Sequence, residues 1–483
     1  MSTTASMPAS ASPIDRLQER GLVHSVTSPT LTRLLKTEKT AVYAGFDPTA
    51  TSLHVGNLLQ IIGLLHFQAL GHQTIALVGG ATGAIGDPSG KSSERVALDP
   101  ETLTANVSSI DAQLRRVFTN AHAYMSRRTS LPPSSSVPTP SSPPSSSSPA
   151  DSSSSINAAA LPHVKILNNL TWFQNLSLLS FLSDAGRLAR VSIMLARDSV
   201  RTRLDSPEGI SFTEFSYQLL QAYDFWHLYR TEGCRVQLGG SDQWGNILAG
   251  MDVIRRKAGR ADDARAGEEE VEPLAFGVTL PLVTTAKGEK FGKSEGNAIW
   301  LDPELVSPYE FYQFFRRTPD SEVQRYLQYF TMLPLSAINT TMSTHSAHPG
   351  KHIPQRLLAK EVTELVHGLD AALKAQTMSQ VSFDGSLTNT RGSDILAAFA
   401  GDERLVTLSK ADVVGADVVQ LALACGAVKS KSAGRKLLAS GGLYLNNAKI
   451  PPENRTVSDA DLIDGVACVV RTGKSQQRVV SVV

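Results

Sequence analysis

The order of apolar and polar residues predicts a parallel α/β sheet in the first half of the chain. An apolar run at residues 40–46 predicts a strand, and residues 53–70 carry apolar side chains at helical spacing up to Gly71. A second strand is expected at residues 74–78, followed by a glycine-rich loop at residues 79–87. Strand, helix, strand is the unit of a parallel sheet, whose ligands bind at the carboxyl ends of the strands.

The same alternation continues further along the chain. We expect strands at residues 164–167, 235–238 and 278–283, helices at 176–196 and 212–229, and a charged, solvated connection at 260–272. The fold class is therefore α/β, with a Rossmann-like parallel sheet at residues 15–300.

In the second half of the chain, the sequence pattern changes from alternating strands and helices to helices followed by a small mixed domain. Helices are expected at residues 308–330 and 354–375, within a helical domain at residues 301–379. A linker is expected at residues 380–404, because residues 380–393 are rich in Gly, Ser and Asn, before a small α+β domain at residues 405–483.

One segment inside the first domain can bury almost nothing. Between residues 130 and 155, 21 of 26 residues are Ser or Pro. Such a composition predicts a solvated, disordered insertion that hangs from a surface loop.

Composition excludes several classes of protein. The chain has 483 residues, of which 41% are hydrophobic and 19% charged, as in ordinary globular proteins of two or three domains. Its 46 Lys and Arg nearly balance 45 Asp and Glu, so nucleic-acid affinity would have to come from local patches. The cysteines, Cys234, Cys425 and Cys468, are too scattered for a disulfide framework or a zinc site. No apolar run reaches the roughly 18 residues of a membrane span.

The first residues leave two interpretations open. Residues 1–14 are rich in Ser and contain no acid, which is typical of a transit peptide, but they also contain no Arg or Lys. A frayed tail fits them as well as a weak transit peptide does.

The glycine-rich loop fits neither of two common nucleotide-binding motifs. Counted from Gly79, Ala81 and Ala84 stand where a dinucleotide fingerprint needs glycine. A P-loop ending in Gly90-Lys91 would need glycine where Ile85 stands. The loop is either a tight turn or a place where backbone approaches a ligand closely.

Two short motifs suggest phosphate chemistry. His54 and Asn57 lie three residues apart at the start of the first helix, where free N–H groups favour anions, and Gly56 between them leaves room for a flat base. Lysines at both ends of Lys290-Phe291-Gly292-Lys293, followed by Ser294, could close on pyrophosphate, and Lys91 and Arg95 offer further mobile cations. Taken alone, the histidine could be structural and the lysines could form a solvated turn.

Together these motifs resemble those of a known family. His54-Val55-Gly56-Asn57 and residues 290–294 are similar to the two signatures of class I aminoacyl-tRNA synthetases. Residues 43–50, 83–91, 211–217, 221–224 and 239–246 resemble segments of bacterial-type and organellar tyrosyl-tRNA synthetases, in the order that family has them. Asn57 departs from the second histidine of the first signature but keeps an N–H donor.

The resemblance implies a set of site residues. Tyr43 and Asp224 would bind the phenol hydroxyl, while Asp87, Tyr217 and Gln221 would hold the α-ammonium group. Asn169 would support the pocket, and Gln243 would lie near the reacting carboxylate. The adenylate would contact Gly45, Asp47, Gly56, Gly239 and Asp242. The ATP phosphates would meet Thr49, His54, Asn57, Lys91, Arg95, Lys290, Lys293 and Ser294.

The C-terminal block points to RNA. From residue 425 to 450 there are five Lys or Arg and no acid, around a short helix expected at residues 432–439. The block resembles the RNA-binding domain of the ribosomal protein S-four type, which implies RNA contacts by Lys429, Lys431, Arg435 and Lys436. Taken alone, the block is better explained as a solvated basic face.

The family implies the reaction and its partners: L-tyrosine is activated by ATP carrying Mg²⁺ and joined to tRNA(Tyr), by a homodimer without a protein metal site. The helical domain would bind the anticodon. A tryptophanyl-tRNA synthetase and a non-catalytic RNA-binding protein remain as rivals. The Ser/Pro insertion and the N-terminus favour the mitochondrial matrix, with the cytoplasm as the alternative.

Overall fold

The chain forms two compact units in its computed structural model, which describes residues 11–90, 98–129, 161–207, 209–259, 272–283, 298–383, 387, 390–453, 455–473 and 476–483. The first unit comprises Met1–Val306 and Pro319–Pro354, and the second comprises Ser307–Thr318 and Gln355–Val483. The segment expected to be a helical domain, 301–379, is divided between them, and the domain ranges themselves stay a prediction.

A six-stranded sheet, in the order β1-β6-β5-β2-β3-β4, forms the centre of the first unit. Its strands are β1 (Ser25–Val26), β2 (Ala41–Phe46), β3 (Gln73–Val78), β4 (Lys165–Asn168), β5 (Cys234–Gly240) and β6 (Phe276–Leu280). All neighbouring pairs are parallel except β1 with β6. The predicted parallel α/β fold is confirmed.

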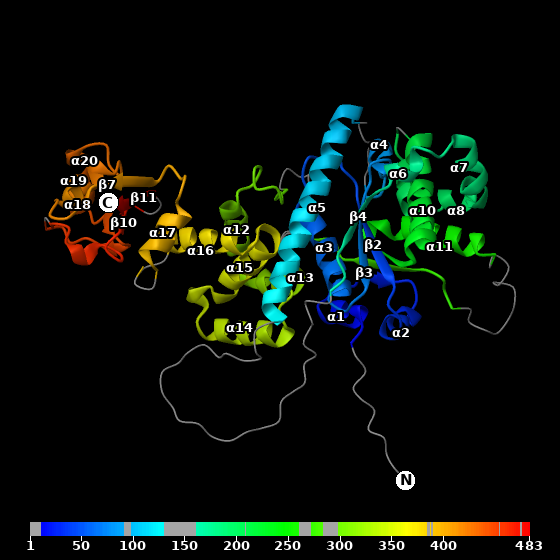
Figure 1. Cartoon of the computed structure of the whole chain (residues 1–483), viewed down its shortest axis with the longest axis horizontal. Coiled ribbons are helices and arrows are strands. Elements are labelled where there is room, and N and C mark those ends of the chain that lie inside the picture. Colours follow the sequence, from blue (N-terminus) through cyan, green and yellow to red (C-terminus); the bar gives the residue numbers. More distant parts are fainter. Residues whose placement is uncertain are drawn as a thin grey trace, which may run out of the picture. The chain divides into compact units, whose positions relative to one another are not determined.

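Helices cover both faces of this sheet (Figure 1). On one side lie α3 (Val55–Gln68) and the long α5 (Pro100–Thr129), and on the other lie α10 (Phe212–Glu232) and α11 (Trp244–Lys257). Helix α3 is apolar nearly all round, because it packs against the sheet on one side and against α1 (Pro13–Glu19) and α13 (Asp320–Phe330) elsewhere.

Shorter helices complete the first unit. They are α2 (Thr30–Thr37), α4 (Thr82–Ile85), α6 (Leu170–Phe173), α7 (Leu178–Asp184), η2 (Gly186–Leu188), α8 (Val191–Leu195), α9 (Asp198–Leu204), η3 (Ser241–Gln243), α14 (Leu335–Ala347) and η6 (Pro349–Lys351).

The prediction of a single amphipathic helix at residues 176–196 is wrong. The segment instead forms α7, η2 and α8, and the extended residues Ala189 and Arg190 separate η2 from α8. Several of its apolar positions do not face a core, since Leu178 and Leu179 are 69% and 79% exposed, although Met194 is buried. The helical spacing is real, but an extended break interrupts it.

Two other expected helices are each divided in two. Residues 308–330 form α12 (Pro308–Arg316) and α13, because Pro319 disfavours helical backbone at the residue before it. Residues 354–375 belong to α15 (Ile353–His367) and α16 (Leu369–Phe383), which are separated by Gly368 at a φ of 88°.

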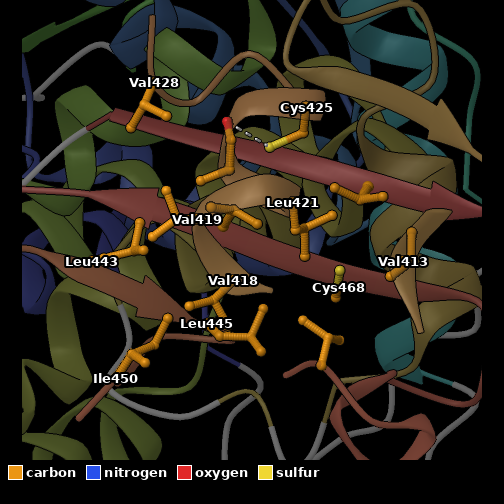
Figure 2. Close-up of a cluster of buried hydrophobic side chains, with 14 of the residues drawn as sticks. Val413, Val418, Val419, Leu421, Cys425, Val428, Leu443, Leu445, Ile450 and Cys468 are labelled. Carbon is orange, nitrogen blue, oxygen red and sulfur yellow. Dashed lines mark hydrogen bonds between the residues drawn. The ribbon is translucent and has the colours of Figure 1, made fainter. Parts of the chain in front are cut away.

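The second unit ends in a five-stranded sheet in the order β7-β11-β10-β8-β9. From Gly392 onward, the strands of this sheet and the helices between them are α17 (Gly392–Ala398), β7 (Leu405–Leu408), α18 (Lys410–Val413), α19 (Val418–Ala424), α20 (Lys431–Ala439), β8 (Leu443–Leu445), β9 (Ala448–Lys449), η7 (Asp459–Asp461), β10 (Ala467–Thr472) and β11 (Gln476–Val482). Valines and leucines from α19, α20 and β8 pack with Cys425 and Cys468 into one core (Figure 2).

Part of the segment expected to be a linker, residues 380–404, is helical. α16 continues to Phe383, and Ile395 and Phe399 of the α17 region are fully buried against Val469 and Val479. The Ser/Pro insertion and nearly all of the charged connection at 260–272 lie outside the described residues. Within the described part of the chain, no helix is long and apolar enough to cross a membrane.

Candidate active site

A cavity of about 760 Å³ opens at the carboxyl ends of β2 and β5. Tyr43 and Gln237 are paired neighbours on these parallel strands, so their side chains face the same side of the sheet. Two residues further along, glycines take the same side: a Cβ built on Gly45 would meet no atom within 4 Å, and one on Gly239 would lie 2.9 Å from Gln243 Cβ. The strands therefore carry large side chains at Tyr43 and Gln237, open space at Gly45, and at Gly239 a glycine against which Gln243 packs.

Tyr43 and Asp224 form what we call the deep end of the cavity. Both side chains are fully buried, and the Tyr43 ring packs against Phe225 with centroids 5.3 Å apart. Asp224 Oδ2 accepts a hydrogen bond from Asn169 Nδ2 (3.0 Å), and Oδ1 accepts one from Trp172 Nε1 (2.9 Å). The buried Tyr43 hydroxyl has no hydrogen-bond partner among the described residues.

Burial controls the protonation of the deep end. It raises the pKa of Asp224 to about 8, although the bonds from Asn169 and Trp172 act in the opposite direction. Burial and the nearby Asp224 raise the pKa of the Tyr43 hydroxyl well above its ordinary value. At neutral pH both groups are therefore mainly uncharged, which suits a neutral polar ligand group.

A second group of lining residues, which we call the open side of the cavity, consists of the partly exposed Asp47 with Tyr217 and Asp87. The Tyr217 hydroxyl donates to Asp47 Oδ2 (2.6 Å), and Thr82 Oγ1 donates to Asp47 Oδ1 (2.8 Å). Burial raises the pKa of Tyr217 well above its ordinary value, with Asp47 and Asp87 adding to the shift. A neutral phenol between two carboxylates suits a cationic ligand group.

A network of amide side chains surrounds Asp87. Gln243 Nε2 donates to Asp87 Oδ2 (2.6 Å), while Gln221 Nε2 donates to Gln243 Oε1 (3.3 Å). Asn246 Nδ2 lies 3.1 Å from Gln221 Oε1, its nearest acceptor here. These bonds fix the amide groups along one wall of the cavity.

The N-terminus of α3 opens onto the same cavity. His54 is the N-cap residue: its Nδ1 accepts from the Gly56 N–H (3.0 Å), and its own N–H donates to Asn57 Oδ1 (3.1 Å). His54, Gly56 and Asn57 all line the cavity, together with Thr49. The Val55 and Gly56 N–H groups are already bonded, to Ile299 O and His54 Nδ1, so it is the helix dipole that favours an anion at this end.

Comparisons with known proteins agree with this geometry. The family model described as tRNA synthetases class I (W and Y) matches residues 35–384. A tyrosine–tRNA ligase of Roseiflexus castenholzii is 40% identical over 473 residues, which cover 97% of this chain and 99% of the relative.

The chain belongs to the tyrosine–tRNA ligases.

Organellar members of this family are similarly related. A chloroplastic/mitochondrial tyrosine–tRNA ligase of Arabidopsis thaliana is 40% identical, over 97% of this chain and 83% of the relative. The crystal structure of a C-terminally truncated Coccidioides posadasii mitochondrial tyrosyl-tRNA synthetase aligns with a TM-score of 0.62 at 36% identity, covering 76% of this chain and 91% of that one. The class I synthetase fold and the tyrosine–tRNA ligase activity of this chain follow from these matches.

Most of the residues singled out for a tyrosine–tRNA ligase site line the one cavity. They are Tyr43, Gly45, Asp47, Thr49, His54, Gly56, Asn57, Asp87, Asn169, Tyr217, Gln221, Asp224, Gly239, Asp242 and Gln243. The five residues on the loops expected to be mobile, Lys91, Arg95, Lys290, Lys293 and Ser294, lie outside the described residues.

Three side chains of the site were missed from the sequence. Thr82 lines the cavity and bonds Asp47, Trp172 bonds Asp224, and Asn246 bonds the wall around Asp87. Trp172 follows β4 closely, as Asp47 follows β2, so a search of strand ends could have found it. Thr82 follows β3 at the same distance and carries the same signal, whereas Asn246 lies within α11 and carries none.

The expected RNA-binding residues lie in the second unit. Lys431, Arg435 and Lys436 are exposed on α20, and Lys429 is exposed just before the Ser430 cap of that helix. Among the described residues, no group of three or more His, Cys, Asp or Glu side chains is placed to share a metal ion.

Proposed function

We propose that this enzyme works in two steps, first forming tyrosyl-adenylate from L-tyrosine and ATP, then transferring tyrosine to the 3′ end of tRNA(Tyr). The observation that carries the proposal is one cavity with two chemically different ends. Its deep end offers the neutral Tyr43 and Asp224, and its open side offers the carboxylates Asp47 and Asp87. Tyrosine has a neutral phenol at one end and an ammonium group at the other.

The residue roles follow from this orientation. Tyr43 and Asp224 bind the phenol hydroxyl, with Asn169 and Trp172 fixing the Asp224 carboxyl group. Asp87, Tyr217 and Gln221 bind the α-ammonium group. Gln243 bonds both Asp87 and Gln221, and it lies beside the reacting carboxylate.

In the first step, a carboxylate oxygen of tyrosine attacks the α-phosphorus of ATP. The bond between that phosphorus and the bridging oxygen of the β-phosphate breaks, and pyrophosphate leaves. In the second step, a hydroxyl of the terminal adenosine of tRNA attacks the carbonyl carbon. The carbonyl–phosphate bond then breaks, AMP leaves, and the hydroxyl proton passes to solvent or AMP.

No side chain needs to act as a nucleophile in either step. Catalysis consists of positioning the two substrates and stabilising the charge that develops on pyrophosphate. His54, Asn57 and Thr49 line the cavity where those phosphates would lie. By resemblance, Lys91, Arg95, Lys290, Lys293 and Ser294 supply the cations and a hydroxyl. Mg²⁺ enters with ATP as part of the substrate.

We propose further that the enzyme is a homodimer joined through residues 170–212. The large apolar side chains exposed in this segment are Leu170, Leu178, Leu179, Leu182, Val191, Ile193, Leu195, Leu204 and Phe212. A concentration of exposed apolar side chains marks an interaction surface. Lys429, Lys431, Arg435 and Lys436 would contact the tRNA backbone.

The proposed site of action is the mitochondrial matrix, where the enzyme would serve organellar translation. Similarity to an Arabidopsis chloroplastic/mitochondrial ligase and to a Coccidioides mitochondrial synthetase supports an organellar role. Imaging a fusion that carries only residues 1–40 tests whether this segment targets mitochondria; a diffuse cytoplasmic signal counts against the assignment.

Isolation of the intermediate tests the two-step mechanism. The enzyme is incubated with labelled tyrosine, Mg²⁺ and ATP, and then separated from free ligands by gel filtration. Labelled adenylate should elute with the protein and transfer its label to tRNA(Tyr) without more ATP. If label reaches tRNA only when ATP is added again, the mechanism is wrong.

A further inference from the structure

Gln237 on β5 is a polar residue of the cavity wall to which the resemblance gives no role. Its side chain is 3% exposed and lines the cavity. Its amide oxygen Oε1 is buried and has no hydrogen-bond partner among the described residues. It is thus a buried polar group that the described part of the chain leaves unpaired and that lies beside the cavity.

The sheet register places Gln237 at the deep end. It is the direct partner of Tyr43 on the neighbouring strand, and both side chains face the helix α10 side of the sheet. Tyr43 also has a buried oxygen without a partner among the described residues. Two polar atoms without a partner among the described residues therefore stand on adjacent strands, and Asp224 lines the same cavity.

Such a group has an energetic cost. A buried polar atom without a partner loses its hydrogen bonds to water and gains none in the protein. An apolar side chain of the same length would avoid that loss. A hydrogen bond from a ligand to this amide would offset the loss and would explain why a glutamine is buried here.

We propose that Gln237 is a specificity-determining residue that hydrogen-bonds the phenol hydroxyl of bound tyrosine, alongside Tyr43 and Asp224. This inference rests on the proposed tyrosine pocket. A phenol hydroxyl donates one hydrogen bond and accepts up to two, so it can satisfy several partners at once. The amide group can turn either its oxygen or its nitrogen toward the hydroxyl. Phenylalanine would leave Gln237 unpaired, which adds to discrimination against it.

The test compares Gln237→Met with Gln68→Met in the full chain. Methionine keeps the length of glutamine but loses the amide. Gln68 is a control matched in burial. It is also 3% exposed, its Oε1 has no partner among the described residues, and it lies on α3 without lining the cavity, although its Nε2 donates to Pro162 O (2.8 Å). ATP–pyrophosphate exchange gives kcat/KM for tyrosine and for phenylalanine, and thermal melting without ligands gives stability.

We expect Gln237→Met to lower kcat/KM for tyrosine about tenfold and that for phenylalanine less than twofold, roughly the effect of one lost hydrogen bond. Its melting temperature should equal or exceed that of wild type. Gln68→Met should leave the ratio of the two kcat/KM values unchanged. Gln237→Glu, which keeps an acceptor, should retain more selectivity than Gln237→Met.

Two results would overturn the inference. One is an equal effect, or none, on tyrosine and phenylalanine. The other is a Gln237→Met protein that fails to fold, because the fold itself would then need the amide. Failure of the proposed function looks different, since the wild-type enzyme would then show no exchange with tyrosine at all.

Discussion

At the scale of single residues, one chain of hydrogen bonds joins the deep end of the cavity to its open side. Asn169 Nδ2 donates to both Asp224 and Thr82, Thr82 donates to Asp47, and Tyr217 donates to the other oxygen of Asp47. Each of these groups restricts the orientation of the next. The two ends of the amino-acid pocket are thereby held at a fixed separation.

Tyr43→Phe should separate binding from folding. The hydroxyl that it removes has no protein partner among the described residues, so the melting temperature should change little. A hydrogen bond to the substrate would be lost, and kcat/KM for tyrosine should fall about tenfold with a much smaller change for phenylalanine. Exchange kinetics and thermal melting measure both effects; a large loss of stability with unchanged selectivity would contradict the role given to Tyr43.

Asp224 should make stability depend on pH. Its pKa rises from 3.8 to about 8 on burial, so the folded state binds a proton that the unfolded state releases between these values. Stability from this group is fully present below about pH 4 and is lost as pH rises to about 8. Beyond pH 8 the loss should level off.

The measurement is urea unfolding of wild type and Asp224→Asn between pH 5 and 8. Asparagine leaves one of the donors Asn169 and Trp172 without an acceptor, a cost that does not vary with pH. The stability of wild type relative to the variant should therefore decline as pH rises. A difference that stays constant would mean that Asp224 is already ionised at pH 5.

At the scale of elements, the N-terminus of α3 has two functions. His54 caps the helix through Nδ1 and also lines the cavity beside Asn57. Loss of a cap costs about 1 kcal/mol. Activity losses at His54 must therefore be separated from losses of stability.

Comparison of His54→Asn with His54→Ala makes that separation. Asparagine is a good N-cap, so His54→Asn should stay near wild-type stability, whereas His54→Ala should lose about 1 kcal/mol. Both should slow adenylate formation about 100-fold or more while changing tyrosine affinity little. Stopped-flow fluorescence and equilibrium titration give the two quantities; wild-type activation rates in His54→Asn would remove His54 from the chemistry.

The elements also show how far the sequence alone could predict this structure. The strands β2 and β3 and helix α3 fall within two residues of their expected limits, because each has a strong apolar pattern and a clear stop. The helix expected at residues 176–196 fails, because helical spacing shows which residues share a face but not where the backbone becomes extended. Its apolar face has the pattern of a core face, although Leu178 and Leu179 are exposed.

The site residues likewise fall into those that the sequence could predict and those that it could not. Tyr43, Asp224 and the other cavity residues could be named because they lie in motifs that resemble a known family. Asn246 and Gln237 could not be, since their importance comes from partners brought close by folding. Only the register of β2 and β5 places Gln237 beside Tyr43.

At the scale of the whole molecule, residues 170–212 provide the proposed dimer surface. Leu179 is 79% exposed, so it contributes little to folding of the single chain. Leu179→Asp should give a folded monomer by analytical ultracentrifugation, where wild type gives a dimer. Leu305→Asp is the control, because Leu305 is 51% exposed but lies outside this segment. A dimer that persists in Leu179→Asp would exclude this residue from the interface.

ATP–pyrophosphate exchange by the purified full chain, with tyrosine, tryptophan and phenylalanine in turn, tests the tyrosine pocket most directly. The pocket around Tyr43 and Asp224 predicts rapid exchange with tyrosine. Discrimination against phenylalanine should be on the order of 10⁵-fold, which is the magnitude already known for tyrosyl-tRNA synthetases as a class. Tryptophan should support essentially no exchange. Preference for tryptophan would contradict the tyrosine pocket, and exchange with none of the three would contradict amino-acid activation itself.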